Sequence, residues 1–196
     1  MKKERKFKKE QILVYLIAFV MIGSTFGVMF YGFSGTSTEL TYGKFTFSRE
    51  QSPKNKWYTK IDGKTIYFDY FPTEVESINL SQEISNRLLN SVEIDFTYYV
   101  NDTKKDVIAY SGYDMQQQLV PKNIYVRIGF TTKSEYNVPV ITCEDATPAV
   151  PVLYLKRTNE TKIYPEGNCV ILEAATDLDI LRLKDRILYS VLGVMK

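Results

Sequence analysis

The sequence predicts one α/β or α+β domain that follows an N-terminal transmembrane helix. Two observations lead to this fold class: a long uncharged apolar run near the N-terminus, and a succession of strand-like and helix-like segments after it. We expect one mixed β-sheet packed by about three helices. The expected organisation is a basic tail at 1–11, a transmembrane helix at 12–33, a polar linker at 34–41 and an extracytoplasmic domain at 42–196.

The apolar run extends from Ile12 to Phe33 and contains 22 residues without a charge. A helix of this length is about 33 Å long and can cross a hydrocarbon core of about 30 Å. Basic residues precede the run, and the next one after it is Lys44. The positive-inside rule therefore places the tail in the cytoplasm and the domain on the outer side of a cell membrane, as in a single-pass protein.

A cleaved signal peptide is the alternative for this run, because the small residues Gly32 and Ser34 could form a cleavage site around Phe33. The apolar region of a signal peptide is only about 7–15 residues long, however, so we favour an uncleaved signal-anchor. Both interpretations export the domain. Within the run, Gly23 and Gly27 match the small-xxx-small spacing that lets transmembrane helices pack closely, which makes helix dimerisation a candidate form of self-association.

The charges are distributed unevenly. Six of the 25 Lys and Arg residues and two of the 23 acidic residues precede the apolar run, so 19 basic and 21 acidic residues follow it. A domain that binds nucleic acid normally carries a clustered basic excess. We therefore exclude nucleic acid as a partner and expect contact with the membrane and with a protein. The sequence assigns no small-molecule ligand.

The first part of the domain is rich in strand-like segments. Alternating aromatic residues predict a strand at 44–48. A turn at 62–64 separates two β-prone runs, at 57–61 and 65–71, which predicts a β-hairpin.

A strand–helix–strand unit is predicted next. Strands at 92–100 and 124–130 flank a helix at 106–119, in which Gly112 is the weak point. This order favours a right-handed crossover and a parallel pair of strands. A further helix is expected at 80–89, with Asn79 and Gln82 as a capping pair, and further strands at 138–143, 152–156 and 169–174.

The last predicted helix begins at Thr176, with Asp179 in the capping-box position. Its apolar stripe comprises Ile180, Leu183, Ile187, Val191 and Val194. Its polar face is expected to carry Arg182, Lys184, Asp185 and Arg186. The alternatives are that the helix lies on a membrane surface or pairs with a partner. Because its polar face is not strongly cationic, we expect the helix to pack on the sheet of its own domain.

The sequence excludes several kinds of active site. It contains no histidine, which removes Ser-His-Asp and Cys-His catalysis and zinc sites with imidazole ligands. It also lacks the glycine-rich motifs that bind nucleotides. We therefore assign no catalytic, cofactor-binding or metal-binding residue.

The two cysteines, Cys143 and Cys169, are expected to form a disulfide, because an exported domain folds in oxidising surroundings. Each is expected on a strand, and the bridge would stabilise the fold by roughly 3–4 kcal/mol. Two free buried thiols are the alternative. Asn79, Asn101 and Asn159 each begin a glycosylation sequon, and Asn79 is the least suitable of the three if it caps a helix.

Acidic and aromatic clusters offer weaker signals. Glu93 and Asp95 share a strand face about 7 Å apart and could act as an acid/base pair, but a solvated sheet face is the simpler interpretation. Glu144 and Asp145 are similarly interpreted as a polar turn. The aromatic run at 67–71 could bind a sugar or a peptide, or could belong to a packed sheet.

Three segments in the C-terminal half, VPVLYL, GNCVILEA and DLDILRLKDRILYSVLGVM, carry a resemblance. Together with the basic tail and the apolar run, they resemble small single-pass membrane-anchored proteins of archaea whose function is uncharacterised. The resemblance implies an anchored extracytoplasmic domain. It implies no activity and no site residues.

Three functions are compatible with the sequence. The first is a membrane-anchored interaction or accessory module without catalysis. The second is a pilin-like structural subunit, although Lys9, Glu10 and Gln11 lack the small residue of a pilin processing site, and Tyr15 stands where a bacterial pilin has glutamate. The third is an exported hydrolase that uses carboxylates, which would need two acids in one cleft.

Overall fold

A computed structural model of the chain describes residues 14–22, 38–50 and 55–195. It divides into two compact units, Met1–Ser37 and Thr38–Lys196.

Only a short part of the first unit is described. Residues 14–22 are helical and their side chains are exposed. The remainder of the predicted transmembrane segment at 12–33, including Gly23 and Gly27, lies outside the described residues. In the ranges that are described, no helix has both the length and the apolar character needed to cross a membrane.

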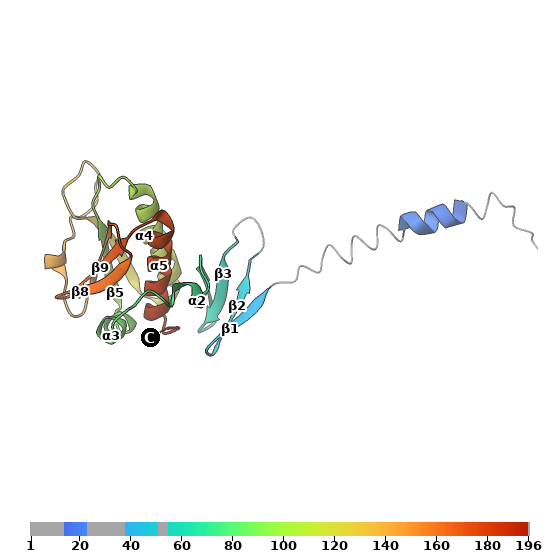
Figure 1. The fold of residues 1–196 in the computed structure, drawn as a ribbon, viewed down its shortest axis with the longest axis horizontal. Helices are drawn as coiled ribbons and strands as arrows, with labels where there is room; N and C mark the ends of the chain where they lie inside the picture. Colours follow the sequence, from blue (N-terminus) through green and yellow to red (C-terminus); the bar gives the residue numbers. More distant parts are fainter. Residues whose placement is uncertain (1–13, 23–37, 51–54, 196) are drawn as a thin grey trace, which may run out of the picture. The chain divides into compact units, whose positions relative to one another are not determined.

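The second unit is an α+β fold that contains two sheets (Figure 1). The first sheet is an antiparallel meander in the order β1-β2-β3-β4. Its strands are β1 Glu39–Tyr42, β2 Phe45–Arg49, β3 Trp57–Ile61 and β4 Lys64–Phe68. The predicted hairpin is confirmed: Asp62 and Gly63 both have positive φ angles (48° and 77°), as a tight turn between β3 and β4 requires.

The second sheet is mixed, as predicted, and has the order β6-β5-β7-β9-β8. Its strands are β5 Glu93–Tyr98, β6 Tyr125–Phe130, β7 Val152–Arg157, β8 Lys162–Glu166 and β9 Cys169–Ala174. β5 pairs in parallel with both β6 and β7, and β7 pairs in parallel with β9, whereas β8 is an antiparallel edge strand. The parallel pair expected across residues 92–130 is therefore confirmed.

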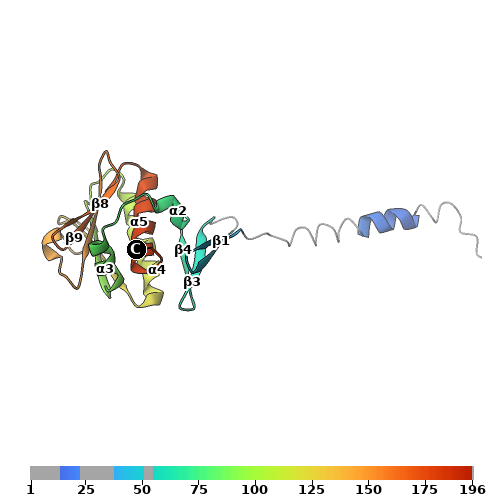
Figure 2. The ribbon, with the colours of Figure 1, turned by 60° about the horizontal axis from the view of Figure 1, so that its bottom comes forward.

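The helices of this unit lie mainly between the two sheets (Figure 2). They are α2 Pro72–Val75, α3 Gln82–Leu89, α4 Lys105–Leu119 and α5 Asp177–Val191, with short 3-10 helices η1 Val120–Lys122 and η2 Cys143–Asp145. α5 contacts α2, α3, α4 and β9. The capping box predicted for α5 is confirmed, because Thr176 Oγ1 accepts from the N–H of Asp179 (3.2 Å) and Asp179 Oδ2 accepts from the N–H of Thr176 (3.1 Å).

Both sides of α5 are buried. One side packs with the apolar residues of the mixed sheet. On the other side the ring of Tyr189 stacks on Phe68 of the meander at 4.3 Å between centroids and meets Phe47 edge to face at 6.0 Å. The prediction that the helix packs within its own domain is confirmed. The polar face expected on this helix is largely buried: Lys184 and Asp185 are fully buried and Arg186 is nearly so.

Two local predictions are also wrong. The segment 138–143 is not a strand: Val140 forms one isolated bridge with Phe130, and Pro139 has no N–H with which to extend the pairing. The N-cap of α3 is Ser81 and not Asn79, because the Ser81 hydroxyl accepts the N–H of Ile84 (3.3 Å).

Gly112 lets α4 lie close to β5. A Cβ atom at this position would lie 2.7 Å from Cδ1 of Phe96, a buried residue of β5. We expect Gly112→Ala to lower the free energy of unfolding by about 1–3 kcal/mol, because overpacking outweighs the better helix propensity of alanine. Urea denaturation measures this change. A variant more stable than the parent would contradict the explanation.

Candidate functional site

The five-stranded sheet has two different faces. Its first face is covered by the helices and is apolar, with Phe96, Leu153 and Val170 in the main core. The second face carries a smaller core. Within the described part of the chain, Ile141 of the segment 131–151 packs there against Val152 of β7 and Ile171 of β9. Parallel strands normally have helices on both faces. We refer to the second face as the open face.

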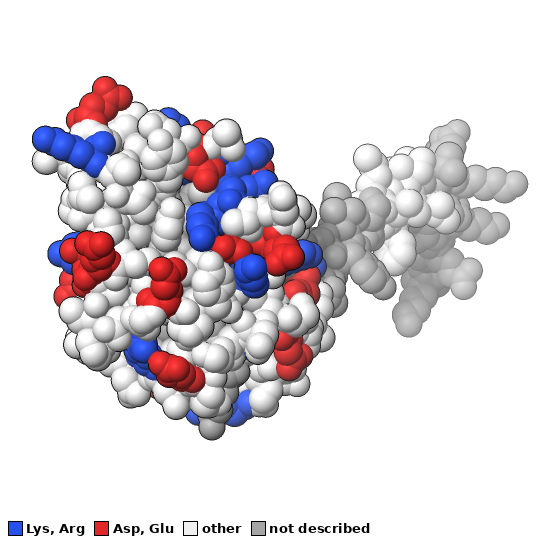
Figure 3. All heavy atoms as spheres, turned by 60° about the vertical axis from the view of Figure 1, so that its left-hand side comes forward, with Lys and Arg blue, Asp and Glu red and all other residues white. Residues whose placement is uncertain are grey.

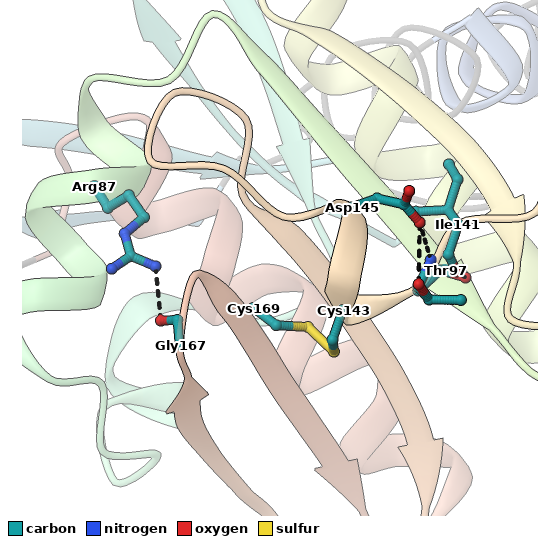
Figure 4. Close-up of a disulfide and its surroundings, with 8 residues drawn as sticks. Arg87, Thr97, Ile141, Cys143, Asp145, Gly167 and Cys169 are labelled. Carbon is teal, nitrogen blue, oxygen red and sulfur yellow. Dashed lines mark hydrogen bonds between the residues drawn. A yellow bond between two sulfur atoms is a disulfide. The ribbon is translucent and has the colours of Figure 1, made fainter.

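A disulfide fastens the segment 131–151 to the open face. Cys143 and Cys169 are joined, as predicted, with their Cα atoms 5.1 Å apart (Figure 4). Cys169 begins β9, but Cys143 lies in η2 and not on a strand. Asp145 accepts hydrogen bonds from the N–H and hydroxyl of Thr142 (2.7 and 3.0 Å), which hold its pKa below the ordinary value. It therefore stabilises the turn that presents Cys143.

Two further contacts hold the same segment against the sheet. The Thr97 hydroxyl of β5 donates to the carbonyl oxygen of Ile141 at 2.7 Å (Figure 4). Gly129 of β6 leaves the space that Ile141 and Pro139 occupy, since a Cβ atom there would lie 2.6 Å from the Ile141 side chain and 2.8 Å from the Pro139 carbonyl oxygen. The segment is thus fixed over β5, β6 and β9.

A groove of about 430 Å³ lies beside this segment on the open face. Strands β7 and β9 supply its base, and the turn around the disulfide supplies a wall. The lining residues are Thr131, Thr142, Cys143, Glu144, Tyr154, Lys156, Glu166 and Ile171.

Charged and aromatic side chains alternate along the groove and the neighbouring edge strand. The Glu173 carboxylate lies 3.2 Å from Lys156 and 3.3 Å from Lys162, and it accepts a hydrogen bond from the Tyr164 hydroxyl (2.9 Å). Burial alone would raise the pKa of Glu173, but these three partners hold it below its ordinary value. The Lys156 ammonium also lies 5.8 Å from the centre of the Tyr154 ring.

Figure 3 shows basic and acidic side chains interspersed on one face of the molecule, with uncharged surface between them. No large area of a single sign is visible on that face. A mixed surface of this kind suits a partner with its own complementary charges better than a polyanion.

The carboxylates considered as an acid/base pair are not equivalent. Asp95 is fully buried and accepts two hydrogen bonds from Arg127, at 2.7 and 2.6 Å, which hold the pKa of that arginine above its ordinary value. Glu93 is half-buried on the same strand. Of the acidic pair after Cys143, Glu144 lines the groove and Asp145 caps η2. Asp95 therefore has a structural partner in Arg127.

The three sequon asparagines, Asn79, Asn101 and Asn159, are all exposed and lie outside the helices and strands. Each side chain therefore has the access that a glycan would need. Asn79, which does not cap α3, also borders a groove of about 400 Å³ beside α5.

A buried group of charges, which the sequence did not predict, lies where α4, α5 and the meander meet. We call Lys56, Asp69, Asp114, Lys184 and Asp185 the buried charge cluster. The Lys184 ammonium lies 2.5 Å from a carboxylate oxygen of Asp69, 2.5 Å from one of Asp114 and 3.0 Å from Asp185 Oδ1. The ammonium donates hydrogen bonds to Asp69 and Asp114, whereas its contact with Asp185 Oδ1 is an ion pair without a hydrogen bond.

Lys56 and the backbone complete this arrangement. The Lys56 ammonium lies 3.2 Å from Asp114 and 3.4 Å from Asp69. Asp185 Oδ2 accepts the N–H groups of Asp69 and Tyr70 at 2.8 and 2.7 Å. The cluster thus joins the end of β4 to α4 and α5.

Three carboxylates share two ammonium groups, so the cluster favours a proton on one acid. Burial alone would lower the pKa of Lys184, but Asp185, Asp114 and Asp69 hold it above its ordinary value. Burial alone would likewise raise the pKa of Asp114, but Lys184 and Lys56 hold it below. Asp185 is fully buried, and burial raises its pKa to about 6.

This shift predicts a pH dependence that Asp185→Asn removes. The folded-state pKa of about 6 exceeds the ordinary value of 3.8, so the folded state binds more protons between these pH values. The protonated Asp185 side chain therefore adds to the free energy of unfolding below about pH 4, and this contribution is lost as the pH rises through 6. We expect the unfolding free energy of the parent, relative to Asp185→Asn, to fall by on the order of 2 kcal/mol across this window.

Urea denaturation of both proteins at several pH values measures the difference between their unfolding free energies. The pH-dependent contributions of the other carboxylates are present in both proteins and largely cancel in this difference. A difference that stays constant from pH 4 to pH 7 would show that Asp185 does not titrate in this range.

Comparison with known proteins adds no family: no protein-family model, curated protein or solved structure matches the chain. Over the described residues, no group of three or more Cys, Asp or Glu side chains is arranged to hold a metal ion. The open face is therefore the candidate functional surface.

Proposed function

We propose that this chain is a membrane-anchored, extracytoplasmic binding module that holds a partner protein on the open face of its five-stranded sheet. One observation carries the proposal: parallel strands β5, β7 and β9 have helices on one face, whereas a disulfide-fastened segment leaves a groove on the other. Parallel strands are normally covered on both faces, so this face has room for an external layer.

The composition of the open face supports a protein partner. Tyrosine is enriched in protein interfaces, and Tyr154 and Tyr164 are half-buried on neighbouring parts of this face. Lys156, Glu173 and Lys162 form a row of alternating charge across three strands. Such a row can select a partner with the opposite order of charges, which gives specificity more than affinity.

The proposed location comes from the sequence. The uncharged run at 12–33, preceded by a basic tail, would anchor the domain outside the membrane. The disulfide Cys143–Cys169 supports this location, because disulfides persist mainly in oxidising compartments.

Mass spectrometry of the protein purified from its own membranes tests the anchor. An intact N-terminal region beginning at Met1 or its successor supports it. A mature terminus at Gln11 would favour a pilin-like subunit instead, and a terminus beyond Phe33 would show a cleaved signal peptide.

Affinity capture of the full-length chain from gently solubilised membranes tests the partner and its location together. We expect one stoichiometric partner, whose affinity falls at least about tenfold when Tyr154 and Tyr164 are both replaced by alanine. The matched control replaces Tyr58 and Tyr67, a tyrosine pair of the meander whose rings lie 5.8 Å apart.

The control variant should bind the partner as the parent does. Absence of a stoichiometric partner, or equal loss of binding in the two double variants, would contradict the proposal. Circular dichroism of both variants establishes that each remains folded.

A further inference from the structure

A separate pocket lies at the carboxyl ends of β5 and β6. The chain leaves β5 toward α4 and leaves β6 into the segment 131–151. Tyr136 and Val138 of that segment border the space beside these strand ends, and Val138 packs against the main core. The resulting pocket has a volume of about 260 Å³.

Three aromatic rings line the pocket. Tyr98 ends β5 and Phe130 ends β6; their rings meet at 88° with centroids 5.1 Å apart. Tyr136, from the segment 131–151, meets Phe130 at 63° and 6.1 Å. In each pair the edge of one ring meets the face of the other; Tyr98 and Phe130 are buried, whereas Tyr136 is exposed. Val100, Val138 and Ala109 supply the remaining apolar lining.

The first turn of α4 supplies the charged residues that line the pocket. Asp106 lines it, and burial together with the Asp106 carboxylate raises the pKa of the Tyr98 hydroxyl. The negative field of Asp106 therefore reaches the aromatic walls. Lys105 also lines the pocket; like Asp106 it is exposed, and its longer side chain can extend into water.

We propose that this pocket binds the methylated ammonium group of a small soluble ligand. An aromatic ring attracts an organic cation through its face. Methyl groups on the cation can contact the apolar lining of the pocket, whereas a small hydrated cation would have to lose its water to do so. A neutral apolar ligand would use the same walls but would gain nothing from Asp106. The chemistry of the pocket thus distinguishes a cation from its neutral isostere.

The test is titration calorimetry of the full-length chain in an uncharged maltoside detergent. Choline is the probe, and neohexanol, in which carbon replaces the ammonium nitrogen, is the neutral control. We expect choline to bind at least about tenfold more tightly than neohexanol. Equal affinities would show an apolar pocket only and would overturn the proposal, as would the absence of choline binding.

Four variants locate the site. Tyr136→Ala and Asp106→Asn should each weaken choline binding several-fold, whereas Lys105→Ala should leave it unchanged or strengthen it. The matched control is Tyr113→Ala, which removes an exposed tyrosine of α4 that does not line the pocket. Choline binding unaffected by both Tyr136→Ala and Asp106→Asn would place it elsewhere and overturn the assignment.

A lipid headgroup carries the same trimethylammonium group as free choline. Titrations in nanodiscs of phosphatidylcholine and of phosphatidylglycerol separate the two sources. Equal choline affinity in both supports a free soluble ligand. Weaker binding in phosphatidylcholine alone would show competition by the headgroup and would overturn the assignment to a soluble ligand.

Discussion

Replacing Lys184 by methionine is expected to lower the free energy of unfolding by about 3–5 kcal/mol, the usual result of removing one partner of a buried ion pair. The substitution keeps the length of the side chain but leaves Asp69, Asp114 and Asp185 close together with only Lys56 to neutralise them. Because Asp185 has no exposed surface, water cannot solvate the charge that remains.

The matched control is Lys104→Met. Lys104 lies 2.9 Å from Asp177, but both side chains are more than two-fifths exposed, so the loss should stay below about 1 kcal/mol. Urea denaturation of residues 38–196 compares the two variants. Adding Asp185→Asn to Lys184→Met should recover part of the stability, since it removes one uncompensated carboxylate. Equal, small losses in both lysine variants would contradict a structural role for the buried charge cluster.

The cluster also explains why the meander packs where it does. Tyr189 of α5 donates its hydroxyl to the carbonyl oxygen of Tyr70 (2.6 Å), beside the two N–H groups that Asp185 accepts. The backbone after β4 is therefore held to α5 by three hydrogen bonds, in addition to the Lys184–Asp69 contact and the Tyr189–Phe68 stack. Gln118 of α4 accepts the N–H of Tyr67 (2.9 Å), which covers part of the free edge of β4.

Much of this fold could be predicted from local sequence patterns. The strands β3 and β9 and the start of α5 were located correctly, because alternation, turn residues and capping pairs act over a few neighbouring residues. The two-sheet arrangement was not predicted. Periodicity identifies an apolar stripe on α5, but it does not show that a second sheet covers the opposite side and buries Lys184 and Asp185.

The candidate sites were predictable only in part. The disulfide followed from the cysteine count and the expected compartment. The groove did not, because it depends on which face of a parallel sheet lacks helices, and that is decided by the path of the segment 131–151. Apolar residues at 138–143 resemble a strand, but Pro139 and the turn into η2 limit the pairing to one bridge at Val140.

Removal of the disulfide is the second large effect that we expect. The bridge closes a loop with a sequence separation of 26 residues. On the chain-entropy model, such a loop contributes about 3–4 kcal/mol, so Cys143→Ser with Cys169→Ser should lower the melting temperature by about 10 °C. Calorimetry of residues 38–196 measures the shift. A reduced parent protein should match the double variant, which separates loss of the bridge from the effect of serine.

The position of the bridge predicts where the remaining structure loosens. Cys143 is the point at which η2 is tied to β9, whereas Thr97 and Gly129 hold only the neighbouring part of the segment around Ile141. Hydrogen exchange should therefore accelerate at 142–151 in the double variant, while the amides of the meander keep their protection. The groove wall would then lose its fixed shape, and partner capture should weaken with it. Equal melting of bridged and unbridged proteins, or loosening spread evenly over both sheets, would contradict this account of the open face.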